Sequence, residues 1–254
     1  MKALILAAGY DTRLAEIAKD TPKPLLTVAG KALIDYTIDK LKTVAGLSGI
    51  VVVSNNKFYN HFCVWVDTYR SPIGASGRCP PIRVVNDRTN TPQERLGSVG
   101  DIHFVWKNES SVDDWLVIGG DNLFDQDLNQ FMAYAGSHSP AVTIGLYDIG
   151  DIASATQFGI SAVDQNGRVI SFQEKPEIPA SSLITMCLYY FPRTTLGYIE
   201  EYRKESKALD AAGSYIQWLV EKKNVYGFQF NGKWYDIGSI ESLQEAQQHF
   251  NSRK

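Results

Sequence analysis

Cysteine is scarce in this sequence, and the few cysteines form no binding pattern. The 254 residues include only Cys63, Cys79 and Cys187, with no Cys-x-x-Cys pair, and the four histidines are scattered. This spacing argues against a disulfide framework and against a zinc site with clustered ligands. Free thiols are typical of a reducing compartment, so we expect a cytoplasmic protein.

Long apolar runs and an excess of charge are also missing. No apolar run approaches the ~20 residues that a membrane helix needs, so we expect no membrane partner. The 25 Lys and Arg residues against 28 Asp and Glu residues give a formal net charge of −3, which offers no positive field for nucleic acid. A composition of 44% hydrophobic and 21% charged residues is ordinary for a globular protein.

The first half of the chain alternates between patterns of buried strands and helices. Continuous apolar runs indicate strands, and apolar residues at helical spacing indicate helices. The expected strands cover residues 3–8, 50–53, 82–85 and 115–118, and the expected helices cover 31–45, 56–70 and 98–108. This alternation predicts an α/β fold with a parallel sheet and helices on both of its faces.

The second half, from about residue 140, has more strands and fewer helices. Asn166-Gly167 indicates a two-residue hairpin turn, and Ser239 is expected to cap the last helix without an acidic partner at Ser242. The expected strands cover 142–147, 157–163, 168–173, 183–191, 225–230 and 233–236, and the expected helices cover 194–205, 213–222 and 239–251. Without a linker or repeat, we expect a single domain over residues 1–254, to which this half adds antiparallel strands.

A loop of small residues follows the first strand and has the composition of a phosphate-binding turn. Residues 6–14 read LAAGYDTRL, at the sheet edge where α/β folds bind ligands. Free N–H groups there can donate to phosphate oxygens, and Arg13 adds a positive fork. Lys23, between Pro22 and Pro24, places an ammonium group in a stiff turn. The alternative is a plain turn with a solvated arginine and lysine, since neither GxxxxGK[ST] nor GxGxxG occurs.

Two aspartates are candidates for a metal site. Asp121 follows the fourth buried strand directly, and Asp236 lies in the segment WYDIGS near the C-terminus. Two carboxylates that converge beside a polyphosphate suit Mg²⁺, which takes one or two carboxylates together with phosphate oxygens and water. The alternative is that both are turn or helix-preceding aspartates, because spacing alone does not show that they meet.

A charged pair follows the second strand of the expected hairpin. Glu174 and Lys175 place a carboxylate beside an ammonium group, which can hold a sugar hydroxyl and a phosphate respectively. Charged residues at strand ends are commonly just solvated, so this pair alone is a weak signal.

Taken together and in order, these motifs resemble those of the sugar-phosphate nucleotidyltransferase family. The series is LAAGYDTRL, TPKPLL, GGDN, FGI, EKP and WYDIGS, and it extends over nearly the whole chain. The resemblance is to glucose-1-phosphate thymidylyltransferases and to their uridylyl and cytidylyl relatives. It implies a Rossmann-like, mostly parallel mixed sheet flanked by helices. An antiparallel β-rich sugar-binding part is added to it, so that residues 1–139 form a nucleotide-binding half and 140–254 an acceptor-binding half. Family members transfer a nucleotidyl group from an NTP to a phosphorylated acceptor, favouring a sugar 1-phosphate, and release pyrophosphate.

The same resemblance implies roles for individual residues. Catalytic contacts with the phosphates fall to Arg13, Lys23 and Lys175, and Mg²⁺ is the implied cofactor, held by Asp121 and Asp236. The nucleotide-binding set is Leu6, Ala8, Gly9, Tyr10, Asp11 and Thr12, with Asn86 and Gly97 as candidates for contact with the base. The acceptor-binding set is Gly159, Glu174 and Lys175.

Three questions stay open from the sequence. Asp11 stands where the family commonly has Gly, Ala or Ser, so a carboxylate lies in the loop that would hold the triphosphate. An acceptor such as phosphocholine is an alternative, because an aromatic pocket binds a cationic head group. The candidate aromatic residues are Tyr189, Tyr190, Trp218 and Trp234. An inactive nucleotide-sugar-binding homologue is the alternative of another class, and a homo-oligomer is compatible with any of these.

Overall fold

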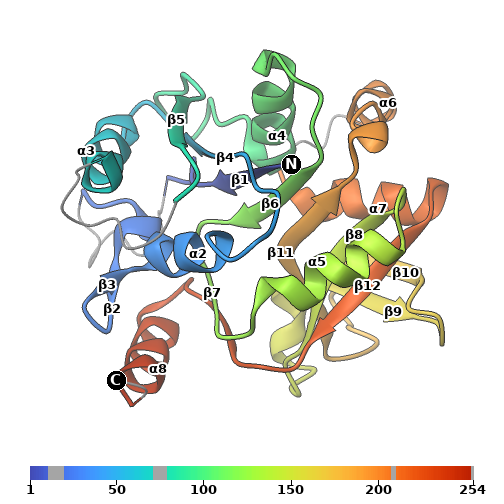
Figure 1. Cartoon of the computed structure of the whole chain (residues 1–254). Coiled ribbons are helices and arrows are strands. Elements are labelled where there is room, and N and C mark those ends of the chain that lie inside the picture. Colours follow the sequence, from blue (N-terminus) through green and yellow to red (C-terminus); the bar gives the residue numbers. More distant parts are fainter. Residues whose placement is uncertain (11–19, 71–78, 207–209, 253–254) are drawn as a thin grey trace. The chain divides into compact units, whose positions relative to one another are not determined.

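The computed structural model (Figure 1) describes residues 1–10, 20–70, 79–206 and 210–252. It divides into two compact units. The first unit comprises Met1–Arg95, Ile118–Leu128 and Gly232–Lys254, and the second comprises Leu96–Val117 and Asn129–Asn231. The units therefore interleave along the chain, and the single domain with functional halves meeting near residue 139 stays a prediction. Asp11, Thr12 and Arg13 lie outside the described residues.

The first unit contains a parallel sheet built from the apolar runs of the N-terminal region. Strand β1 (Lys2–Leu6) pairs in parallel with β4 (Gly49–Ser54), which pairs in parallel with β5 (Ile82–Asn86). From Ile50 to Ser54 every residue of β4 is buried, as expected for a strand covered on both faces. The three expected strands of this region are confirmed, and all three end at the same edge.

Two helices and a small hairpin accompany this sheet. The helices are α2 (Leu33–Leu41) and α3 (Tyr59–Arg70), and the hairpin pairs β2 (Thr27–Val28) with β3 (Lys31–Ala32). The prediction of a helix from residue 31 was wrong at its start, because β3 occupies the first two positions. The turn between β2 and β3 uses two residues with positive φ, Ala29 at 49° and Gly30 at 78°.

The C-terminal segment belongs to the first unit. Strand β13 (Trp234–Asp236) pairs antiparallel with β7 (Asn122–Phe124), and helix α8 (Ile240–Asn251) follows. In Figure 1, α8 lies near the β2–β3 hairpin, and Val28 and Ala246 share one buried cluster. Residues from both ends of the sequence therefore form one core.

Helix α8 is capped by two serines. Ser239 Oγ accepts a hydrogen bond from the backbone N–H of Ser242, and Ser242 Oγ accepts one from the N–H of Ser239. A capping box is therefore present, with a serine at N3 in place of the acidic residue whose absence the sequence indicated. A serine hydroxyl takes the acceptor role that usually belongs to Glu or Gln.

The second unit contains a mixed sheet. Strand β11 (Leu183–Phe191) pairs antiparallel with β8 (Val142–Asp148) and with β9 (Gly159–Val163), and β9 pairs antiparallel with β10 (Val169–Glu174). Strand β12 (Val225–Phe230) runs parallel to β8, so the added strands are not all antiparallel. Helices α6 (Tyr198–Glu205) and α7 (Ala212–Lys222) connect β11 to β12 and form the last part of the long connection between β8 and β12, which a parallel pair requires.

The remaining elements include two that the sequence did not suggest. Strand β6 (Trp115–Gly119) and helix α4 (Gly97–Asn108) match expectations, whereas helix α5 (Leu128–Ser137) and strand β7 were not predicted. The strands of the β9–β10 hairpin are confirmed, but its turn is longer than two residues, because β9 ends at Val163 and β10 begins at Val169. Within the described ranges, no helix has both the length and the apolar character that crossing a membrane requires.

Candidate functional site

A buried asparagine fixes the start of the loop after β1. Asn55, which follows β4 and is fully buried, donates from Nδ2 to the carbonyl oxygens of Ala8 at 3.0 Å and Gly9 at 3.1 Å. Its Oδ1 accepts from the N–H of Phe58 at 3.0 Å. Asn55 was not among the residues predicted from the sequence, although it lies just beyond a buried strand, at the edge of the sheet where α/β folds bind ligands.

Tyr10 connects the same loop to the segment after β5. Its hydroxyl donates to Thr89 Oγ1 at 2.9 Å, and Thr89 Oγ1 donates to the carboxylate of Asp87 at 2.8 Å. Asp87 and Thr89 are each 5% exposed, so this relay lies in a buried environment. A hydroxyl that donates to a carboxylate is left to accept from Tyr10, which fixes the direction of both hydrogen bonds.

Asn86, predicted to contact the base, lies at the end of β5. Its Oδ1 accepts from the N–H of Arg88, and its Nδ2 donates to Asn56 Oδ1 at 2.8 Å. Arg88 has a φ of 71°, a conformation that costs energy for a residue with a side chain. Three loops at the carboxyl edge of β1, β4 and β5 are thus joined by side-chain hydrogen bonds, and Asn86 is one of the residues that join them.

Lys23 and Asp121 form an ion pair. Lys23 Nζ lies 3.0 Å from Asp121 Oδ2, and the two side chains are 17% and 34% exposed. Close packing explains the approach: the N–H of Gly120 donates to Leu6 O at 2.9 Å, and a Cβ at Gly120 would lie 2.7 Å from that oxygen and 2.9 Å from Pro24 Cγ. A glycine is therefore required where the GGDN and PKP segments meet the end of β1.

Asp236 lies beside Asp121 in the fold. It is opposite Asn122 in the β7–β13 pair, and the N–H of Ile237 donates to the carbonyl oxygen of Asp121 at 3.2 Å. The two aspartates, 115 positions apart in the sequence, are thus brought to neighbouring backbone positions, and the convergence of their carboxylates stays a prediction. Trp234 Nε1 donates to Asn122 Oδ1 at 2.6 Å, which holds the two strands together.

The chemistry of these groups suits Mg²⁺ only if a phosphate completes the site. Across the described residues, no group of three or more His, Cys, Asp or Glu side chains is placed to hold a metal. Two carboxylates with phosphate oxygens and water are a common Mg²⁺ environment. The pairing of Asp121 with Lys23 shows that this carboxylate already attracts a cation.

The predicted acceptor residues come together in the second unit. Gly159 and Glu174 are opposite each other in the β9–β10 pair, and Lys175 donates its N–H to Phe158 O at 3.1 Å. Lys175 has a φ of 45°, and its Nζ lies 3.9 Å from Glu174 Oε1. Burial raises the pKa of Glu174, whereas the Lys175 ammonium opposes that rise.

The two candidates for contact with the base belong to different units. Asn86 lies in the first unit and Gly97 in the second. Gly97 begins α4 with a φ of 74°, and the next residue, Ser98, donates its N–H to Asp210 O at 2.9 Å. A role in reading the base stays a prediction for both.

Three of the four aromatic residues considered for a cationic head group are part of the core. Tyr189, Tyr190 and Trp218 are 4%, 8% and 8% exposed. Trp218 donates from Nε1 to Glu205 Oε2 at 2.9 Å and packs against Tyr202. Their burial supports the structural interpretation of these rings over an open aromatic pocket.

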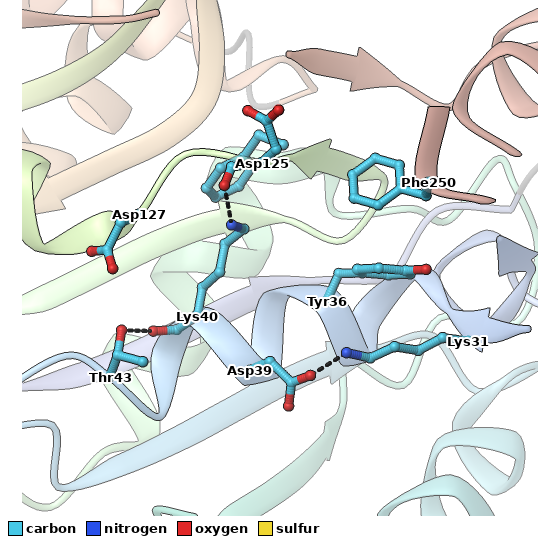
Figure 2. A pocket seen from close by; sticks show the side chains of 9 residues that line it. Lys31, Tyr36, Asp39, Lys40, Thr43, Asp125, Asp127 and Phe250 are labelled. Carbon is cyan, nitrogen blue, oxygen red and sulfur yellow. Dashed lines mark hydrogen bonds and ion pairs between the residues drawn. The ribbon is translucent and has the colours of Figure 1, made fainter. Parts of the chain in front are cut away.

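A hollow of about 350 Å³ in the first unit is lined by groups that pair with one another (Figure 2). Lys40 Nζ donates to the carbonyl oxygen of Asp125 at 3.0 Å, and Lys31 pairs with Asp39. This hollow adjoins the C-terminal end of β7, whereas Asp121 directly precedes the start of that strand. None of the residues that line the hollow was predicted from the sequence to be a site residue. We therefore place the candidate site at the Asp121 end of β7.

The family model described as "Nucleotidyl transferase" matches residues 2–253. The chain belongs to the nucleotidyl transferase family. This confirms the family that its ordered motifs resemble.

Curated nucleotidyl transferase relatives are longer than this chain. The "Bifunctional protein GlmU" of Methanococcus aeolicus is 28% identical over 251 residues, which cover 98% of this chain and 54% of the relative. The glucose-1-phosphate adenylyltransferase of Thermosipho africanus is 28% identical over 258 residues, with 96% and 60% covered. The chain thus spans little more than half the length of the curated relatives it matches.

Solved structures confirm the fold class. A UDP-glucose pyrophosphorylase complexed with UDP-glucose aligns with a TM-score of 0.81 at 19% identity, covering 100% of this chain and 99% of that chain. A chain proposed to be a glucose-1-phosphate thymidylyltransferase, from Bacillus anthracis, aligns with a TM-score of 0.77 at 24% identity, with 99% and 95% covered. This nucleotidyl transferase is a mixed α/β protein whose mostly parallel central sheet is flanked by helices, with antiparallel strands added.

Proposed function

We propose that this protein transfers a nucleotidyl group from an NTP to a sugar 1-phosphate, forming an NDP-sugar and pyrophosphate in a Mg²⁺-dependent reaction. The observation that carries the proposal is the Lys23–Asp121 ion pair, placed where β7 pairs with the strand that contains Asp236. A positive group and two carboxylates there, beside the loop that follows β1, make a site for a metal-bound polyphosphate.

The proposed reaction needs no covalent intermediate and no strong base. An oxygen of the acceptor phosphate forms a bond to the α-phosphorus of the NTP, and the bond from that phosphorus to the α,β-bridging oxygen breaks. The bridging oxygen leaves with pyrophosphate, so charge is conserved without a proton transfer. The main obstacle is the repulsion between two anions, and positioned positive groups remove it.

Particular side chains can supply this compensation. Lys23 would hold phosphates of the NTP, since its ammonium already lies beside a carboxylate of the same site. Lys175 would hold the acceptor phosphate, since its ammonium is 56% exposed beside Glu174. Arg13, outside the described residues, would act on the NTP phosphates. Bound Mg²⁺, held by Asp121 and Asp236, would neutralise phosphate charge and favour departure of pyrophosphate.

The base and the acceptor are the finer parts of the proposal. We favour dTTP, UTP or CTP as donor, on the resemblance of the motifs to thymidylyl, uridylyl and cytidylyl transferases. The names of the relatives include an adenylyltransferase, so ATP belongs in any test. Glu174 and Gly159 would contact the acceptor's sugar, and the carboxylate would accept hydrogen bonds from its hydroxyl groups.

The proposal is tested by pyrophosphate release with Mg²⁺. The assay crosses five NTPs (dTTP, UTP, CTP, ATP and GTP) with glucose 1-phosphate, other sugar 1-phosphates and phosphocholine. We expect release with one preferred NTP and a sugar 1-phosphate, and none when either substrate is omitted. Activity with phosphocholine alone would replace the acceptor, and protein that binds an NTP yet turns over no pair would favour an inactive binding homologue.

A further inference from the structure

The carboxylate of Glu174 occupies the space that a side chain at Gly213 would take. A Cβ built on Gly213, the second residue of α7, would lie 1.6 Å from Glu174 Oε2 and 2.4 Å from Glu174 Cδ. Real Cβ atoms essentially never approach a heavy atom this closely. Any residue other than glycine at position 213 therefore displaces the Glu174 carboxylate or the helix.

The strand on the other side confines Glu174 as well. A Cβ on Gly159 would lie 3.2 Å from Glu174 Oε2 and 2.4 Å from Phe172 Cζ. The backbone N–H of Glu174 donates to Gln217 Oε1 at 3.4 Å, one turn of α7 beyond Gly213. The carboxylate thus lies between two glycines, one on β9 and one on α7, with its own backbone tied to the same helix.

We propose that Gly213 is a specificity-determining residue, because the missing side chain is what lets the Glu174 carboxylate take the position from which it selects the acceptor. This inference rests on the proposed function, in which Glu174 contacts the acceptor's sugar. The raised pKa of Glu174, caused by its burial, agrees with a carboxyl group held in an enclosed place. Gly213 acts through Glu174 and touches no reacting atom.

An alanine at position 213 has a defined expected effect. Its methyl group meets the far end of a flexible side chain, so the Glu174 carboxylate is expected to swing aside while α7 and β10 stay in place. The acceptor then loses hydrogen bonds to a charged group, which should raise its KM by about 10-fold. The KM for the NTP and kcat should stay within about 2-fold of the wild type, since the missing contact contributes to uniform binding of the acceptor.

The test combines kinetics with a double-mutant cycle. The variants are Gly213→Ala, Glu174→Asp and the pair, with Gly136→Ala as the matched control, because a Cβ on that helical glycine meets no atom within 4 Å. Each variant is assayed for acceptor KM, for NTP KM, and for its discrimination between the preferred sugar 1-phosphate and its monodeoxy analogues. Urea unfolding of the same four proteins measures the contact without any turnover.

The expected results are specific. Gly213→Ala should abolish the preference for the full acceptor over one deoxy analogue. Glu174→Asp has a side chain one methylene shorter, which leaves more room for the alanine methyl group. In the double variant, the loss of unfolding free energy and the rise in acceptor KM should therefore both be smaller than additivity predicts. Gly136→Ala should resemble the wild type. Additive effects in both measurements, or an unchanged acceptor KM in an active Gly213→Ala protein, would overturn the inference. A wild type without turnover, even if the unfolding cycle shows coupling, would refute the acceptor role together with the proposed function.

Discussion

Replacing Asn55 should loosen the loop after β1 and reduce the stability of the protein. Asn55 is fully buried and makes three hydrogen bonds to backbone groups, those of Ala8, Gly9 and Phe58. At about 1 kcal/mol for each hydrogen bond, Asn55→Ala should lower the free energy of unfolding by about 3 kcal/mol. The carbonyl group of Ala8, a buried residue, loses its partner, and that of exposed Gly9 is released, so the loop that would hold the NTP is disturbed.

An isosteric variant separates hydrogen bonding from packing. Asn55→Asp keeps the size and an acceptor for Phe58, but it has no donor for the two carbonyl groups, and an ionised buried carboxylate facing them is unfavourable. At neutral pH it should destabilise the protein at least as much as Asn55→Ala does. The control is Asn56→Ala, which removes exposed amide hydrogen bonds only and should cost less than about 1 kcal/mol.

The measurement is urea unfolding followed by circular dichroism, with the free energy extrapolated to water. The same proteins are then assayed for the KM of the NTP, which should rise for both Asn55 variants. If the free energy of unfolding of Asn55→Asp at pH 7 lies within about 0.5 kcal/mol of the wild-type value, the amide's hydrogen bonds contribute little to stability. The shape of the side chain alone would then account for an asparagine at this position, which would refute the hydrogen-bond explanation. It is also refuted if the effects of the Asn55 and Asn56 variants are indistinguishable.

Three further predictions concern other residues. Asp121→Asn should abolish Mg²⁺-dependent turnover and weaken Mn²⁺ binding in the presence of NTP, measured by electron paramagnetic resonance; unaltered Mn²⁺ binding would remove Asp121 from the metal site. Burial raises the pKa of Glu174 above its ordinary 4.5, so the folded state holds that proton more tightly than the unfolded state does. The free energy of unfolding of the wild type, relative to that of Glu174→Gln, should therefore fall as pH rises from 4.5 through the raised pKa. A rise in this difference would contradict burial as the cause. Ser239→Ala should lower the unfolding free energy by about 1 kcal/mol through loss of the α8 cap, whereas Ser252→Ala at the other end of α8 should stay within 0.5 kcal/mol, and equal losses would mean that the cap adds nothing.

The strands were predictable where apolar runs end abruptly. The expected bounds of β11 and β12, residues 183–191 and 225–230, agree with the structure, because polar residues or proline interrupt each run. Helix α5 was missed, since Gly136 and the polar residues near its start weaken the helical pattern. Strand β7 has three residues, too few for any periodicity, and it exists because β13 arrives from a distant part of the chain.

The site could be predicted only as far as residue types go. The motifs identified Lys23 and Asp121 separately, but their ion pair joins residues 98 positions apart, and no spacing rule gives such a contact. It depends on Gly120, which lets the end of β1 approach. Asn55 was missed for a related reason, because its value lies in the backbone carbonyls that it holds, and these cannot be seen until the strand order is known.

The position of a phosphorus label after turnover distinguishes nucleotidyl transfer from the other reactions of an NTP. The protein is incubated with Mg²⁺, the preferred sugar 1-phosphate and the NTP that supports release, labelled with ³²P in either the α- or the γ-position. For nucleotidyl transfer we expect the α-label in the NDP-sugar and the γ-label in pyrophosphate, in equal amounts. Label from the γ-position on the acceptor would show phosphoryl transfer, and γ-label released as inorganic phosphate alone would show hydrolysis; either result would contradict nucleotidyl transfer by this site.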